Sequence, residues 1–345
     1  MNKNFILVSL SALLCFFISS CKKDQLLLSS KSQIELVPDV TIEDDYLKFK
    51  NDRVFDSLST LLMKRPGSTI GDFVDGVAGF KSYGDIFLAL EHEYESVNDN
   101  DSFNKFRNKY KSLVGISGDS SLTYKFGTPL SSKFVNLGGE VKVGDHMIVY
   151  TKDSRIISYK GARKTEDELR AIKYTDSLNG ISVQNVAVGN WTSKLIAVAN
   201  QATTSLVASA LYYNGDGKRR LLVECWVESY VSPNRTRVYV TSKQELKKTF
   251  GGWRTNETNY SFNNVKFNSI TLTPPSYPVH HEFILNNYSI NNVYGPILID
   301  MGINTGFDVS GLGFGNFTSG GVPNAPQFGA KWPKDPWGPV ISATD

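Results

Sequence analysis

The first feature of the hydrophobic pattern is an almost continuous apolar run, Phe5–Ile18, close to the N-terminus. One lysine precedes this run, and Ser19 and Ser20 follow it. A charged start, an apolar middle and a small-residue exit are typical of a secretory signal peptide. A helix that spans a membrane needs about 20 apolar residues, so a permanent N-terminal anchor is the less favoured alternative. The pattern predicts that residues 1–20 are a signal peptide.

Apolar residues then recur every three or four positions in three segments between residues 43 and 115, which predicts amphipathic helices. We expect Asn51 or Asp52 to cap the first helix and Asp101 or Ser102 to cap the third. A short strand is expected just before the first helix. Two strands are expected within 134–153.

From about residue 183 the pattern changes to short alternating segments, which predict strands. A long hairpin is expected from Arg219–Tyr230 and Arg235–Ser242, and 243–249 is expected to be a charged helical turn or bulge. The expected fold class is therefore α+β, with a helical N-terminal half containing a small hairpin. The C-terminal half is expected to be an antiparallel β sandwich or barrel-like. We place a tether at 21–42, a helix-rich α+β domain at 43–182 and an antiparallel β-rich domain at 183–345.

The residues around Cys21 explain the end of the apolar run. The segment Ile18–Cys21, "ISSC", resembles the lipobox of bacterial lipoproteins. The resemblance implies that lipid is attached to the Cys21 thiol and that signal peptidase II cleaves between Ser20 and Cys21. More than one acyl chain holds a protein stably on a membrane, so we expect a lipid anchor at the outer membrane. A single acid, Asp24, follows Cys21 in place of an acidic cluster. The anchored protein is therefore expected either at the cell surface or at the periplasmic face of the membrane.

Three further stretches carry a second resemblance: "LKF" at Leu47–Phe49, "GFKS" at Gly79–Ser82 and "VNLGGEVKVGD" at Val135–Asp145. Together they resemble the uncharacterised surface lipoproteins of Bacteroidetes. In the last stretch Asn136 and Leu137 are exchanged relative to the family pattern. These residues belong to turns and packing, so the resemblance implies a family and a location but no activity.

Cysteine content and charge narrow the possibilities further. Of three cysteines, Cys15 leaves with the signal peptide and Cys21 takes lipid, so Cys225 has no partner for an internal disulfide. We predict that Cys225 is a small buried residue of a strand, and the alternative is a reactive thiol. The formal net charge is +3, without a strong basic patch, which disfavours nucleic-acid binding.

The motifs of common enzyme chemistries are incomplete. His92-Glu93 and His281-Glu282 each lack the second histidine, four residues beyond the first, that a zinc protease helix requires. The glycine-rich 302–321 lacks the spacing of a phosphate-binding loop, and no nucleophile elbow is present. We therefore predict no catalytic residue, no metal and no cofactor.

Three tryptophans are candidates for glycan stacking: Trp226, Trp332 and Trp337. Trp226 shares a strand face with Glu224 and Glu228, which could form a sugar platform or an ordinary packed sheet face. The sequence favours a non-enzymatic binding or structural module for a glycan or an envelope partner. The alternative is an envelope glycan-acting hydrolase that uses dispersed carboxylates.

Overall fold

The protein is described by a computed structural model. Its contacts divide the chain into Met1–Leu36 and Val37–Asp345, and every described residue belongs to the second unit. The structure describes residues 37–151, 154–159, 168–169, 171–185, 205–213, 217–230, 235–249, 251–263, 265–273, 277–285, 287–305, 327–331 and 341–342. The expected signal peptide, Cys21 and most of the tether lie outside these residues.

The first half of the described chain contains a six-stranded sheet in the order β1-β2-β5-β6-β7-β8. Strands β2 and β5 pair in parallel, and the other neighbours are antiparallel. In β2 Leu47 and Phe49 alternate with more exposed residues and are fully buried. The strand bounds are β1 Val40–Glu43, β2 Tyr46–Phe49, β5 Glu140–Val143, β6 His146–Tyr150, β7 Ser154–Ser158 and β8 Ile181–Asn185.

Three helices connect β2 to β5, and a side chain caps each of them. They are α2 Asp52–Lys64, α3 Tyr83–Glu95 and α4 Asn100–Tyr110, with caps at Asn51, Ser82 and Asp99. The Asn51 cap and the β2 strand confirm the sequence prediction. The cap predicted at Asp101 or Ser102 is wrong, because the Asp99 carboxylate accepts a 2.7 Å hydrogen bond from the Ser102 amide and starts the helix earlier.

A small hairpin follows α4. It consists of β3 Val114–Ile116 and β4 Leu122–Tyr124, joined by the turn 117–121. Two short 3₁₀ helices, η1 Ile70–Asp72 and η2 Ser131–Lys133, complete this half. None of the described helices is long and apolar enough to cross a membrane.

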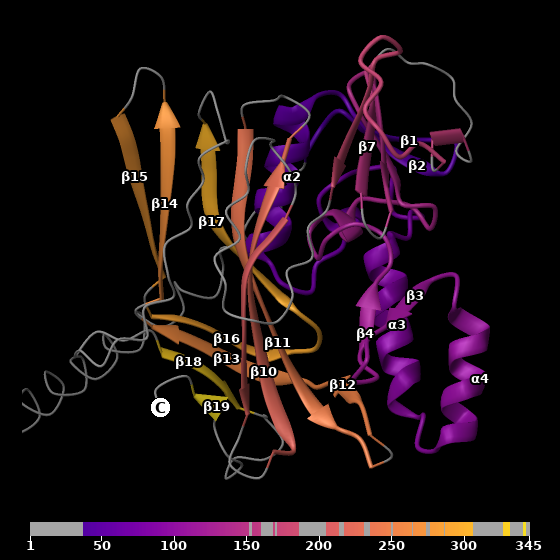
Figure 1. Cartoon of the computed structure of the whole chain (residues 1–345), viewed down its shortest axis with the longest axis vertical. Helices are drawn as coiled ribbons and strands as arrows, with labels where there is room; N and C mark the ends of the chain where they lie inside the picture. The colour runs from indigo at the N-terminus through magenta and orange to yellow at the C-terminus, as the bar shows by residue number, and fades with distance from the viewer. Residues whose placement is uncertain are drawn as a thin grey trace, which may run out of the picture. The chain divides into compact units, whose positions relative to one another are not determined.

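The second half is built from long antiparallel strands (Figure 1). The central sheet has the order β12-β11-β10-β9. Strand β17 pairs with the N-terminal part of β11, and β12 pairs with its C-terminal end. A four-stranded sheet has the order β16-β13-β18-β19, and β14 and β15 form a separate hairpin. The bounds are β9 Ser205–Tyr213, β10 Arg219–Ser229, β11 Arg235–Lys247, β12 Trp253–Thr255, β13 Thr258–Asn263, β14 Val265–Thr273, β15 Tyr277–Leu285, β16 Tyr288–Val293, β17 Ile297–Thr305, β18 Gln327–Lys331 and β19 Ile341–Ser342.

A continuous apolar core joins the two halves. Helix α2 contacts both β2 and β17. At this junction the ring of Phe55 meets the ring of Tyr230 edge-on, with centroids 6.0 Å apart, and packs on Phe134 with centroids 4.6 Å apart. Helix α2 is therefore packed between strands from both parts of the sequence.

The predicted fold class is wrong in two respects. Strand residues outnumber helical residues over the described chain as a whole, and the first half contains a six-stranded sheet beside its three helices, so it is not a helical half with one small hairpin. In the second half the described strands form several separate sheets and no closed barrel. The charged helical turn or bulge predicted at 243–249 is mostly strand, because β11 continues to Lys247 and pairs with β10 from Thr236 to Leu246.

Two predicted domain boundaries fall inside strands. The end of the tether at residue 42 lies within β1, and the boundary between 182 and 183 lies within β8. Both strands belong to the six-stranded sheet.

The long hairpin predicted around residues 232–234 is confirmed by the pairing of β10 with β11.

The turn before β5 gives a test of local packing. Gly139 has a φ of +81°, and a Cβ added there would lie 2.5 Å from the Tyr150 carbonyl oxygen, whereas Gly76 has a φ of +79° and meets no described atom within 4 Å. Both alanine variants strain the backbone, but only Gly139→Ala also displaces a strand. We expect Gly139→Ala to lower the free energy of unfolding by about 1–3 kcal/mol more than Gly76→Ala in urea denaturation. Equal losses would contradict this packing.

Candidate functional site

The hairpin of β10 and β11 carries charged residues on one face. Because side chains alternate along a strand, Arg220, Glu224 and Glu228 share this face with Glu245 and Arg237 of the opposite strand. A charged strand face normally meets water, yet Arg220, Glu228, Arg237 and Glu245 are all buried. Their charges therefore require partners within the protein.

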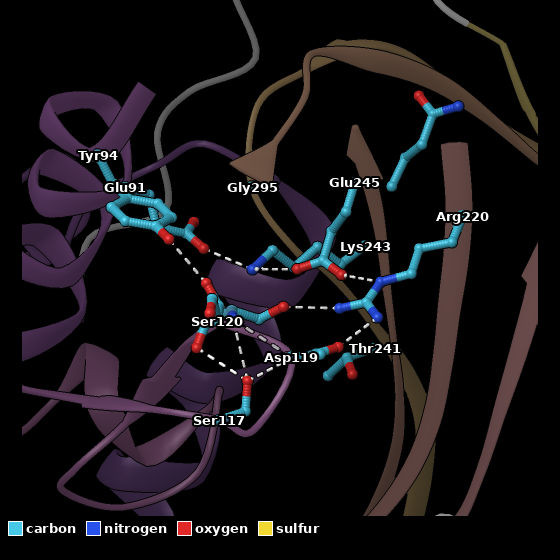
Figure 2. A network of polar contacts seen from close by, with 12 residues as sticks. Glu91, Tyr94, Ser117, Asp119, Ser120, Arg220, Thr241, Lys243, Glu245 and Gly295 are labelled. Atoms are coloured by element: carbon cyan, nitrogen blue, oxygen red, sulfur yellow. Dashed lines mark hydrogen bonds and ion pairs between the residues drawn. The ribbon is translucent and has the colours of Figure 1, made fainter. Parts of the chain in front are cut away.

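Arg220 joins the sheet to the β3–β4 turn (Figure 2). Its side chain is 4% exposed, and its Nε donates to Glu245 Oε2 at 2.6 Å. Its Nη1 donates to Asp119 Oδ2 at 2.5 Å, and its Nη2 donates to Ser121 Oγ at 2.7 Å. The guanidinium also lies over the Trp253 ring, 4.3 Å from the centroid. All three nitrogens of this buried guanidinium therefore donate to the protein.

Lys243 extends the same network to helix α3. Its Nζ donates to Glu91 Oε1 and lies 3.1 Å from Glu245 Oε1. Burial alone would lower the pKa of Lys243, but the carboxylates of Glu91 and Glu245 raise it above the ordinary value. The residues Glu91, Lys243, Glu245, Arg220 and Asp119 form a row of alternating charge, which we call the charge row. It attaches α3 and the β3–β4 turn to the central sheet.

The β3–β4 turn is held from several sides. Ser117 Oγ donates to Asp119 Oδ1 at 2.5 Å, and the Tyr94 hydroxyl donates to the Ser120 carbonyl at 2.7 Å. Burial alone would raise the pKa of Asp119, but hydrogen bonds from Ser117 and Arg220 outweigh it and lower the pKa to about 2. Asp119 is therefore ionised at neutral pH, and the turn 117–121 is fixed in place.

A second ionic cluster fixes helix α2. Arg237, 1% exposed, donates from Nη1 to Asp300 Oδ2 at 2.5 Å and from Nε to the Tyr230 hydroxyl at 2.8 Å. Its Nη2 donates to the Asp56 carboxylate and to Thr60 Oγ1, the latter at 2.8 Å. Asp56 and Thr60 belong to α2, whereas Asp300 belongs to β17. One guanidinium thus links a helix to two strands.

Glu224 and Glu228, the carboxylates considered for glycan hydrolysis, are both engaged with other side chains. Glu228 is 3% exposed and accepts hydrogen bonds from Thr128 Oγ1 at 2.9 Å and from the Tyr150 hydroxyl at 3.1 Å. Glu224 accepts from Trp226 Nε1 and Thr241 Oγ1, both at 3.1 Å. Burial raises the pKa of each carboxyl above the ordinary value, although these hydrogen bonds oppose it.

The predicted stacking residues are placed as follows. Trp226 shares the face of Glu224, as predicted, but the residue is 7% exposed and offers no open surface to a sugar. Trp332, Trp337 and Cys21 lie outside the described residues, and stacking and lipidation there stay predictions. Cys225 lies in β10, where only its backbone is described.

Of the histidines considered as metal ligands, the structure describes the side-chain surroundings of His92. His92 stacks on Tyr294 with ring centroids 3.7 Å apart, and its Nδ1 lies 3.7 Å from Glu95 Oε1. His280 and His281 are consecutive residues of β15. Among the described residues, no group of three His, Cys, Asp or Glu side chains is arranged to hold a metal ion.

An open pocket lies between α4 and the β3–β4 hairpin. Its volume is about 300 Å³, at the lower end of the range of ligand sites. Helix α4 and the residue that follows it contribute a ring and two cations, and the hairpin contributes two aliphatic residues and two hydroxyls. The lining residues are Phe103, Arg107, Lys111, Val114, Ile116, Ser117 and Ser120. The lining contains no carboxylate and no histidine.

The two cations of this pocket differ from the other basic residues of α4. Lys105 pairs with Asp101 at 2.7 Å, and Lys109 pairs with Glu93 at 3.2 Å. Within the described part of the chain, the side chains of Arg107 and Lys111 have no hydrogen-bond or ion-pair partner, and both residues are exposed. Their charges are free to meet a ligand.

Sequence reasoning missed this pocket. The spacing of Phe103, Arg107 and Lys111 by four residues was a signal, because such residues share a helix face. The opposite wall, however, depends on the turn 117–121, which Arg220 holds from 99 and 101 residues away. A contact over that separation has no local signature in the sequence.

Comparisons with known proteins give no assignment. No family model matches the chain, and no curated protein matches it. The crystal structure of a DUF4848 family protein from Bacteroides thetaiotaomicron aligns with 80% of this chain and 98% of its own, at 14% sequence identity and a TM-score of 0.30. A similarity this weak carries no argument, so the resemblance to Bacteroidetes lipoproteins stays a prediction.

The buried acid Glu228 predicts a pH dependence. Burial raises its pKa, so between the unfolded value of about 4.3 and the raised value the folded protein binds more protons than the unfolded chain. The free energy of unfolding therefore falls as pH rises through this window. In urea denaturation at about pH 4.5 and 7.5, we expect the wild type to lose stability relative to Glu228→Gln as pH rises.

Glu43 supplies the control for this experiment. Hydrogen bonds from Lys48 and Lys142 lower the pKa of Glu43 to about 2. The stability that Glu43 contributes is therefore lost only as pH falls from the pKa of the unfolded chain toward the pKa of the folded protein. The stability difference between wild type and Glu43→Gln should stay constant over the same pH range. A constant difference for Glu228→Gln as well would contradict its raised pKa.

Proposed function

We propose that the protein is an exported lipoprotein, anchored at the outer membrane through lipid on Cys21, and that its described part is a non-enzymatic binding module. The anchor rests on the apolar run that ends in "ISSC" at residues 18–21. The tether that follows gives the module reach from the membrane surface. The module faces either the outside of the cell or the periplasm.

The observation that carries the binding role is the open pocket beside α4. Arg107 and Lys111 lie at its edge without partners among the described residues, and the turn opposite them is fixed by the charge row. A rigid wall lowers the entropic cost of binding, because fewer groups have to be ordered when a ligand arrives. The site is suited to recognition.

The placement of the acids favours binding over glycan hydrolysis. A hydrolase needs two carboxyl groups on either side of a substrate. Glu228 is buried on Thr128 and Tyr150, and Glu224 accepts hydrogen bonds from Trp226 and Thr241. We therefore expect the partner to be an envelope component that binds at the surface pocket, and not a glycan stacked on the buried Trp226.

The anchor is tested by metabolic labelling with palmitate in a bacterial host. Wild-type protein should incorporate label, and Cys21→Ala should fall to background because it lacks the thiol that accepts lipid. Cys225→Ala is the matched control, since it removes the other cysteine predicted to remain in the mature chain, and it should keep full label. Label on Cys21→Ala, or none on wild type, would contradict the anchor. Protease treatment of intact cells then distinguishes surface from periplasmic display.

A further inference from the structure

We propose that the pocket beside α4 binds a small organic anion, with an acidic group such as a carboxylate or phosphate attached to an apolar body. This inference rests on the proposed binding function and names the ligand class. It is argued from the charges at the edge of the pocket, the apolar residues in its lining and the fixed turn on its far side.

The acidic group of the ligand is inferred from the two cations on α4 and at its end. Arg107 and Lys111 are one helical turn apart, so both side chains reach the same side of the helix. An acidic group between them would gain two charge-assisted hydrogen bonds, which are stronger than neutral ones. Lys125 donates from Nζ to the Lys111 carbonyl at 3.1 Å and adds a third positive charge nearby.

Nearby acids do not cancel this charge. Asp119 is the acid of the neighbouring turn, and its two carboxylate oxygens are engaged by Arg220 and Ser117 (Figure 2). Glu93 is held by Lys109 and by the Tyr110 hydroxyl. The pocket therefore presents net positive charge to an incoming ligand.

The apolar body of the ligand is inferred from the other residues that line the pocket. Phe103, Val114 and Ile116 provide an aromatic ring and two branched side chains, which favour an apolar body over a fully hydrated ion. Ser117 and Ser120 add hydroxyls at the turn. Ser120 has a φ of +59°, an uncommon conformation for a residue other than glycine, and the Tyr94 hydroxyl bonded to its carbonyl helps to hold it there.

The size of the pocket selects small ligands. A volume of about 300 Å³ accommodates a one- or two-ring compound and not a folded partner. Bare inorganic phosphate would leave the apolar lining unused, and an uncharged ring would leave both cations without a partner. The chemistry of the lining therefore requires both properties in one molecule.

The test uses three ligands with one apolar body: 2-naphthoate, 2-naphthalenemethanol and 2-naphthylmethylamine. Binding to purified full-length protein is measured by titration calorimetry in one detergent, with inorganic phosphate as a fourth ligand. We expect naphthoate to bind about tenfold more tightly than the alcohol, because two charged donors contribute at least one decade of affinity. The amine should bind more weakly still, and phosphate alone should bind more weakly than naphthoate.

Variants then assign binding to the pocket. Arg107→Gln/Lys111→Gln should abolish the preference for naphthoate over the alcohol. Lys64→Gln/Lys105→Gln is the matched control, because it removes the same formal charge from α2 and α4 at residues that do not line the pocket. It should leave the preference unchanged. All four residues are exposed, so both variants should keep the wild-type fold, which circular dichroism checks.

Each contrary outcome has a distinct meaning. Equal binding of all three naphthalenes would overturn the anionic class while leaving the pocket as a binding site. Phosphate that binds as tightly as naphthoate would overturn the apolar half. Unchanged preference in Arg107→Gln/Lys111→Gln, or no binding of any ligand to wild type, would overturn the inference at this pocket. The palmitate experiment on Cys21 tests the anchor independently of all of these results.

Discussion

The charged face of the β10–β11 hairpin has to be buried, and this requirement organises the rest of the structure. Removing an ion from water costs several kcal/mol even after the protein relaxes. Arg220 and Lys243 are therefore accommodated only because Asp119 and Glu91 reach them from the first half of the chain, with Glu245 between them. Arg237 repeats the arrangement with acids from α2 and β17. The ionic contacts thus specify which helix covers which part of the sheet.

The same contacts prepare the surface pocket. The turn 117–121 would be an ordinary exposed loop if it depended on the short β3–β4 hairpin alone, since isolated hairpins are marginally stable. Arg220 holds it through Asp119 and Ser121, and Tyr94 holds it through Ser120. The charge row, which is buried at Arg220 and Glu245, therefore fixes one wall of the proposed anion site, while α4 and Lys111 supply the free cations on the other.

Local signals in the sequence predicted the Asn51 cap, β2 and the long β10–β11 hairpin, because each depends on neighbouring residues. The start of α4 was misplaced because Asp99, Asp101 and Ser102 are all good cap residues. The segment 243–249 contains good helix formers, yet it is strand up to Lys247 because pairing with β10 and the charge row outweigh local propensity. Alternation along β10 also could not reveal that its charged face is buried, since that depends on residues about a hundred positions away.

The most direct test of the charge row is a double-mutant cycle on Lys243 and Glu91, measured by urea denaturation. Lys243→Met leaves the buried Glu91 carboxylate without its cation, which we expect to cost about 3–5 kcal/mol of stability. Adding Glu91→Leu removes that stranded charge and should recover most of the loss. The exposed pair Lys105 and Asp101 is the control, with a coupling of about 1 kcal/mol or less. A double variant less stable than Lys243→Met alone would contradict the account.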